Sequence, residues 1–354
     1  MLSDDQESCT LPISQNSGQV TSTKISPQPL SIAAGDISLG QFSINVLLDE
    51  ILLEIFSCYV EESLMRDAWH TLACVCRRWR SIALGSPRRL NLRIFCSEET
   101  RIPVRENLDF WPPFPIVLTV DYFRNSGKLD DNILATLEHH DRVCQIEIAN
   151  MSSSIWEKAR PLMQKSFPIL TELNLGYEDG MPVPSVVPDL FLGGTATRLR
   201  KLNLAGIPFP GLPKLLLSAT HLVHIDLDDI PVSGYIAPEV MVACLSTLTR
   251  LESLVLRFKS PRLHPEWERR RRSSSTRSLL PSLTYFTFNG ASVYLEDILD
   301  QIDAPLLNRL SISFFHQPIF DTPRLAQFIS RVPKLKNCNE ARLSLGSWDV
   351  SVTV

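Results

Sequence analysis

The chain has 354 residues, 44% of them hydrophobic, which is enough for two or three domains or one long repeat array and excludes a wholly disordered protein. Its 35 basic and 39 acidic residues give a net charge of −4, which argues against general nucleic-acid binding and against a polybasic membrane-surface protein. No stretch approaches the roughly 18 apolar residues of a membrane span, and eight cysteines without a C-x-x-C pair favour reduced thiols in a cytoplasmic or nuclear protein.

Residues 1–40 are the first predicted region. They are rich in Ser, Thr, Gln, Asn, Pro and Gly and contain no Phe, Tyr or Trp. Such a segment cannot bury enough surface to offset the entropy lost on ordering, so we predict a disordered tail. A plain linker is favoured over a regulatory tail that carries phosphorylation sites.

Residues 41–90 are predicted to form a small helical module. One apolar stripe with helical spacing runs along Ile51, Leu52, Ile55, Phe56 and Tyr59. A second stripe runs from Leu72 to Ala83, and Gly85 offers a left-handed helix stop. Two or three helices in about 45 residues make too small a core to be secure alone. The module is therefore expected to lean on a partner or on the next domain.

Residues 91–354 carry an internal period. The pattern L-x-x-L-x-L begins at Leu170, Leu199, Leu222 and Leu251, with weaker copies from Val143, Leu283 and Leu307. Outlying strand-like runs end at Leu92, Leu118 and Leu345, and the mean spacing of about 28 residues is that of leucine-rich repeats. We therefore predict an α/β fold, an irregular solenoid of strand-turn-helix repeats that stack because none buries its apolar face alone. An ordinary doubly wound domain is the alternative, but no Gly-rich strand-to-helix turn supports it.

Helical stripes fall between the predicted strands. The clearest are Leu295 to Ile302 and Leu325 to Val332, and for the second Thr322 is the expected N-cap with Pro323 at the first helical position. Proline is unusually common, with 25 residues against 14 glycines. Because proline punctuates elements rather than filling them, this ratio predicts many short elements with regular stops.

The residues between the inward leucines should point to the opposite face of the sheet, where repeat proteins bind other proteins. The central row of that face is predicted to be Glu147, Asn174, Asn203, Asp226, Val255, Thr287 and Ser311. The row before it runs from Gln145 to Arg309 through Glu172, Lys201, His224, Ser253 and Tyr285, and the row after it includes Asp228 and Arg257. Our candidates for a substrate face are Glu147, Asn174, Asn203, Asp226, Asp228, Arg257 and Tyr285. Plain solvent exposure is the alternative for each of them.

No catalytic motif is found. The chain lacks the phosphate-binding glycine patterns, the G-x-S-x-G elbow and the H-E-x-x-H zinc motif. His70 and Cys74 are spaced as metal ligands but have no second pair, so a packing role is favoured. We expect a protein that is not an enzyme and has no cofactor and no metal. The run Arg269–Arg272 before Ser273 is interpreted as a solvated loop, with an import or phosphorylation signal as the alternative.

The segment Leu47 to Phe56, followed by Leu72 to Arg80, resembles the F-box motif. It is similar to F-box proteins expanded in mushroom-forming fungi, which also share Trp69-His70, Ser86 to Leu90 and Trp111 to Ile116. The resemblance implies a Skp-type adaptor of a cullin–RING ubiquitin ligase as partner, with an unknown protein substrate held by the repeats. By motif position it implies adaptor contacts at Leu47, Leu48, Ile51, Leu52, Ile55, Leu72, Val75, Cys76 and Trp79.

These observations lead to one expected function and one alternative. The chain is expected to be the substrate-recognition subunit of a Skp–cullin–F-box ubiquitin ligase, with a tail at 1–40, an F-box domain at 41–90 and repeats at 91–354. The alternative is a leucine-rich-repeat scaffold with no ligase role. A hydrolase or redox enzyme hidden in the repeats is the third and least favoured hypothesis.

Overall fold

The computed structural model describes residues 44–63, 68–97, 104–121, 127–177, 187–259, 277–315, 322–336, 342–345 and 349–353. The chain divides into two units, Met1–Leu48 and Asp49–Val354. In the first unit the described residues include the 3-10 helix η1 (Ile44–Val46). The tail expected at residues 1–40 and the run Arg269–Arg272 lie outside the described residues.

The second unit begins with three helices, α1 (Asp49–Glu62), α2 (Ala68–Val75) and α3 (Arg77–Gly85). The second predicted stripe is divided at Cys76, whose backbone is extended and whose Sγ accepts a hydrogen bond from the Trp79 N–H at 3.5 Å. Cys76 thus serves as the N-cap of α3. The left-handed stop expected at Gly85 is wrong. The helix ends there, but Gly85 is not among the glycines with positive φ, and the Ser86 N–H closes the turn on the Ala83 carbonyl.

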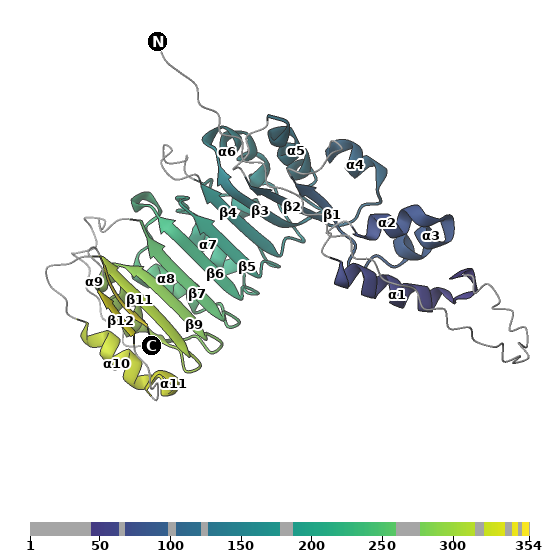
Figure 1. Cartoon of the computed structure of the whole chain (residues 1–354). Coiled ribbons are helices and arrows are strands. Elements are labelled where there is room, and N and C mark those ends of the chain that lie inside the picture. The colour runs from purple at the N-terminus through teal and green to yellow at the C-terminus, as the bar shows by residue number, and fades with distance from the viewer. Residues whose placement is uncertain are drawn as a thin grey trace, which may run out of the picture. The chain divides into compact units, whose positions relative to one another are not determined.

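Among the described residues, eleven strands form one sheet in the order β1-β2-β3-β4-β5-β6-β7-β9-β11-β13-β12 (Figure 1). Every pairing from β1 to β11 is parallel. These strands are β1 (Ile94–Ser97), β2 (Ile116–Asp121), β3 (Val143–Met151), β4 (Glu172–Tyr177), β5 (Lys201–Ala205), β6 (His224–Ile230), β7 (Ser253–Phe258), β9 (Tyr285–Gly290) and β11 (Arg309–Phe315). The short strands β8 (Ser278–Leu279) and β10 (Ile302–Asp303) pair with each other.

Two of the predicted strands differ from the structure. The run ending at Leu92 is a turn, because the N–H groups of Leu90 and Leu92 bond back to Ser86 and Pro87 instead of to a neighbouring strand. The copy ending at Leu345 is β12 (Arg342–Leu345), which is not the next parallel strand. Instead β13 (Asp349–Thr353) pairs antiparallel with both β11 and β12.

Helices and short 3-10 turns connect the strands and lie on one side of the sheet (Figure 1). They are α4 (Val104–Phe110), α5 (Gly127–Glu138), α6 (Ser153–Ala159), η2 (Leu162–Gln164), η3 (Phe191–Gly194), α7 (Leu212–Ser218), η4 (Val232–Gly234), α8 (Pro238–Leu245), α9 (Ser292–Gln301), α10 (Pro323–Arg331) and α11 (Pro333–Lys336). Prolines open α7, α8, α10 and α11. Their fixed φ and missing N–H suit the first helical turn, which explains part of the high proline count.

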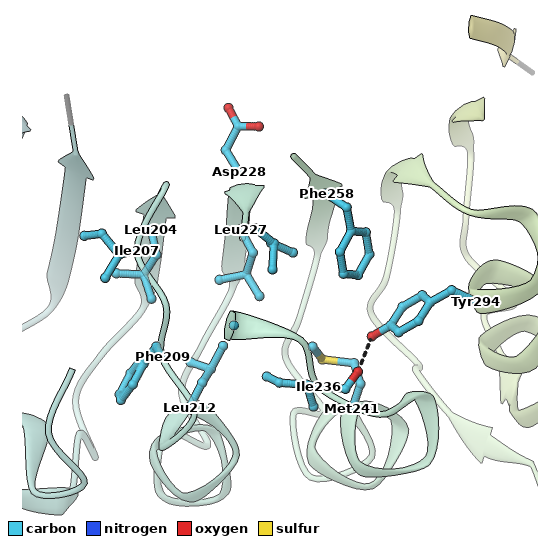
Figure 2. A pocket seen from close by; sticks show the side chains of 12 residues that line it. Leu204, Ile207, Phe209, Leu212, Leu227, Asp228, Ile236, Met241, Phe258 and Tyr294 are labelled. Carbon is cyan, nitrogen blue, oxygen red and sulfur yellow. Dashed lines mark hydrogen bonds between the residues drawn. The ribbon is translucent and has the colours of Figure 1, made fainter. Parts of the chain in front are cut away.

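The core lies between the sheet and these helices. The leucines of each L-x-L run are buried, and most of the residues that alternate with them are half-buried. Figure 2 shows Leu204 and Leu227 pointing toward the helices and Asp228 pointing away. We call the side of the sheet opposite the helices the open face. The fold is thus a helical module followed by an α/β region with a parallel sheet.

Candidate functional site

The helical module is held together by apolar packing and by charge. Leu52 and Phe56 of α1 are fully buried, and the Phe56 ring lies against Trp79 of α3 with centroids 4.8 Å apart. Arg78 of α3 forms an ion pair with Asp49 at the start of α1, with Nη2 and Oδ1 2.5 Å apart. The two helices are therefore held together by both a ring contact and an ion pair.

An apolar stripe remains exposed on α1. Ile51, Ile55 and Tyr59 follow one another at four-residue spacing and are 47%, 43% and 42% exposed. Val75, at the end of α2, is also exposed. Scattered exposed apolar residues are common, but three in line on one helix form a surface suited to a partner helix. The helical period predicted one stripe here, and the structure divides it into a buried half and an exposed half.

The nine residues expected at the adaptor surface fall into three groups by burial. Exposed are Leu48, which belongs to the first unit, and Ile51, Ile55, Val75 and Cys76. Half-buried are Leu47 and Trp79, and buried are Leu52 and Leu72. The structure therefore brings Ile51 and Ile55 together on one helix side, and it places Leu52 and Leu72 beneath the surface as support.

An aromatic cluster joins α2 to the segment before β2. The indole of Trp69 is buried, donates from Nε1 to the Arg93 carbonyl at 3.0 Å, and meets Trp111 edge-on with centroids 4.9 Å apart. Phe114 also lies edge-on to Trp69, at 5.5 Å, and His70 stacks on Trp111 at 4.7 Å. We call Trp69, His70, Trp111 and Phe114 the aromatic joint. In the sequence, Trp69, Trp111 and Phe114 were noted only through a family resemblance, and His70 also as a residue favoured for packing. The contact among the four was missed.

Arg142 extends this joint to the sheet. Its Nε donates to the Phe114 carbonyl at 3.3 Å and its Nη2 to the Pro112 carbonyl at 3.4 Å. Burial lowers the pKa of the Arg142 guanidinium below its usual value. Because Arg142 immediately precedes β3, the helical module is connected to the third strand through packed side chains and hydrogen bonds.

The strand register confirms the predicted central row of the open face and the row before it. In the central row Glu147 pairs with Asn174, Asn174 with Asn203, Asn203 with Asp226, Asp226 with Val255, Val255 with Thr287, and Thr287 with Ser311. The row before it aligns from Gln145 to Arg309 in the same way. The seven substrate-face candidates are all half-buried. Val255 differs from its row because it is buried.

Ion pairs cross the open face between neighbouring strands. Lys201 lies 3.4 Å from Glu172, and Arg257 lies 3.6 Å from Asp226 and 3.3 Å from Asp228. Burial raises the pKa of Asp226, an effect that Arg257 opposes and Asp228 reinforces. One arginine is thus shared by two carboxylates.

The other end of the open face carries an arginine over an aromatic ring. The guanidinium of Arg309 lies 6.0 Å from the centre of the Tyr285 ring, within the range of a cation–π contact. Tyr285 and Arg309 are register partners on β9 and β11. The face is therefore acidic near β3 and β6 and basic at β11.

A small apolar cavity lies on the helix side of the sheet (Figure 2). Leu204, Leu227, Met241 and Phe258 are among its lining residues, and Tyr294 donates a hydrogen bond to the Ile236 carbonyl there at 3.0 Å. The cavity of about 20 Å³ has room for about one water molecule. Burial raises the pKa of Tyr294, which suits a hydrogen-bond donor in the core rather than an acid.

The described residues contain no group of three His, Cys, Asp or Glu side chains placed to hold a metal ion. In the same part of the chain, no helix has the length and apolar character needed to cross a bilayer. Burial is the largest cause of the shifted pKa values of Arg142, Cys144 and Asp226.

The comparisons with known proteins add one match. Residues 49–93 match the family described as F-box-like. No curated protein matches the chain. The matched segment contains the three helices, the exposed stripe of α1 and the carbonyl of Arg93 that receives the Trp69 hydrogen bond. Residues 49–93 of this chain therefore form an F-box-like domain.

Proposed function

We propose that the chain is the substrate-recognition subunit of a Skp–cullin–F-box ubiquitin ligase. F-box domains generally bind Skp-type adaptors, and F-box proteins are typically non-catalytic receptors. The observation that carries the proposal is the F-box-like match at 49–93. In this role the chain holds a target near the ligase's loaded conjugating enzyme and leaves the chemistry to other subunits, a proximity effect. Such a receptor acts in the cytoplasm, the nucleus or both.

The exposed stripe supports the adaptor contact. Ile51, Ile55 and Tyr59 present apolar surface along α1, and Val75 and Cys76 expose the α2–α3 corner. Burial of such side chains against a partner removes apolar area from water and contributes roughly 25 cal/mol per Å². The buried Leu52 and Leu72 would hold the helices in place beneath this surface, and the half-buried indole of Trp79 would add to the contact with the adaptor.

The α/β region supports target binding. We propose leucine-rich repeats over residues 91–354, after an F-box domain at 41–90 and a tail at 1–40, as in the expanded fungal F-box family. The supports are the L-x-L runs about 28 residues apart and their parallel, in-register strands. The proposed substrate face consists of Glu147, Asn174, Asn203, Asp226, Asp228, Arg257 and Tyr285, and the target is a protein.

Co-purification with a Skp-type adaptor tests the proposal. The double variant Ile51→Glu, Ile55→Glu places charge on the exposed stripe and leaves the core intact, so it should lose the adaptor. Val240→Glu on α8 is the matched control, because Val240 is 43% exposed and far along the chain from the matched segment. Equal adaptor recovery for both variants, or none for the wild-type chain, would contradict the assignment.

A second measurement separates a ligase receptor from a scaffold. Proteins captured by the full chain with the proteasome blocked should accumulate ubiquitin, and their lifetimes should increase when residues 49–93 are deleted. Captured partners whose lifetimes do not change upon this deletion would instead indicate the scaffold without a ligase role.

A further inference from the structure

A row of polar side chains on the open face has no partner within the described chain. Glu147, Asn174 and Asn203 are half-buried register neighbours on β3, β4 and β5, and their side chains form no hydrogen bond or ion pair with any described residue. A side-chain amide both donates and accepts hydrogen bonds. The two asparagines can therefore pair with the N–H and C=O groups of a chain laid across the strands.

The residues beside this row have small side chains or none. Two residues further along each strand, on the same face, lie Ala149, Gly176 and Ala205. Gly176 and Ala205 are register partners, and a Cβ added at Gly176 would meet its nearest atom, the Asn150 backbone nitrogen, only at 3.5 Å. A second backbone can therefore approach the sheet at this place.

Both ends of the row are acidic. Glu147 has no cation among the described residues, and at the other end Asp226 and Asp228 share the charge of Arg257. The nearest lysine, Lys201, lies 3.4 Å from Glu172 and is balanced by it. Each end therefore carries a net negative charge, with two amides between them, and a cationic group is complementary to each end.

The spacing of the two ends sets the spacing of the cations. Glu147 and Asp226 are three strands apart, roughly 14 Å at about 4.8 Å per strand. An extended chain rises about 3.3 Å per residue, so four residues cover roughly 13 Å and return to the same side. We infer that the open face over β3–β6 binds an extended segment of the target that carries lysine or arginine at two positions four residues apart.

This inference rests on the proposed function, since it names the class of target. The probe is a short labelled peptide of serine and threonine with two arginines four positions apart, titrated against the full chain by fluorescence anisotropy. Two comparison peptides are used: one has its two arginines adjacent, and the other has glutamate in place of both arginines. The four-residue spacing should bind about fivefold more tightly than the adjacent pair, with the preference decreasing as salt rises.

A charge exchange makes the test specific to the row. Glu147→Arg should weaken binding of the two-arginine peptide about fivefold. A peptide with one of its arginines changed to glutamate should restore the affinity for this variant. Asp131→Arg on α5 is the matched control, because its exposed side chain has no partner among the described residues and lies off the open face. It should leave binding unchanged.

Several results would overturn the inference: no preference for spacing, equal weakening by Glu147→Arg and Asp131→Arg, or tighter binding of the acidic peptide. The last result would move the site to the arginines at the strand starts, Arg198, Arg200 and Arg250. Adaptor co-purification is scored separately on residues 49–93. Loss of peptide binding with the adaptor retained rejects the inference alone, and loss of the adaptor with peptide binding retained rejects the proposed function alone.

Discussion

Asp226 lies among groups that act on its carboxylate in opposite directions. Burial raises its pKa above the usual 3.8 and is the largest cause, Arg257 lowers it, and Asp228 raises it. The folded chain therefore holds the Asp226 proton more tightly than the unfolded chain does. As the pH rises from 3.8 through the folded-state pKa, ionisation of Asp226 lowers stability, and above that pKa the loss is complete.

We expect Asp226→Asn to increase the free energy of unfolding near neutral pH, because the amide is not penalised by burial as the carboxylate is. The gain should grow as the pH rises above 3.8 and then become constant. Urea unfolding at a series of pH values measures it. Asp131→Asn, on an exposed and partnerless side chain, is the control and should show little change. A variant less stable than wild type near neutral pH would show that the Arg257 pair outweighs burial.

Helix α10 is capped by another helix. Thr322 occupies the N-cap position, as predicted, but its side chain makes no capping hydrogen bond. Glu296 of α9 does so instead, since Oε2 accepts the Arg324 N–H at 2.8 Å and Oε1 the Leu325 N–H at 2.9 Å. The Glu296 side chain is buried, so these two backbone donors depend on it for their hydrogen bonds.

Glu296→Gln should lower the free energy of unfolding by about 1–3 kcal/mol, because the amide NH2 would face a buried backbone donor. Thr322→Ala should cost less than about 0.5 kcal/mol, since it removes no hydrogen bond seen at the cap. Chemical denaturation of the two variants beside wild type makes the comparison. Equal losses of unfolding free energy in the two variants would show that Glu296 contributes no more to the cap than Thr322 does.

The sequence predicted those features that follow from the alternation of buried and exposed side chains along a strand. The central row from Glu147 to Ser311 follows from alternation along each strand, since a shift of one residue would turn the buried leucines outward. The Glu296 cap and the antiparallel pairing of β13 with β11 could not be predicted, because each joins residues through tertiary contacts that leave no local period. In the module, the 3.6-residue period marked Ile51 and Leu52 alike, and only the tertiary packing of the three helices distinguishes the buried residue from the exposed one.

At the scale of the second unit, the aromatic joint connects the F-box-like domain to the sheet. Trp111 stacks on His70 and meets Trp69 edge-on, so it contacts α2 from outside the matched segment. The carbonyls of Pro112 and Phe114 accept hydrogen bonds from Arg142, which immediately precedes β3. A domain of 45 residues has a marginal core of its own, and this contact adds buried aromatic area to it.

Trp111→Ala should therefore destabilise α2 locally and leave the middle of the sheet intact. Hydrogen exchange followed by mass spectrometry should show faster exchange in α2 and unchanged exchange in β5–β7, with a loss of about 2 kcal/mol in local stability. Phe110→Ala is the matched control, because Phe110 is 72% exposed and its ring lies edge-on to Trp111. It should change the local stability of α2 by less than about 1 kcal/mol.

Two other outcomes would contradict this prediction. Faster exchange in every strand would mean that Trp111 supports the whole fold, and unchanged exchange in α2 would mean that the F-box-like domain is stable without the aromatic joint. Only the expected pattern, with faster exchange in α2 and unchanged exchange in β5–β7, would show that the sheet stabilises the F-box-like domain through the aromatic joint.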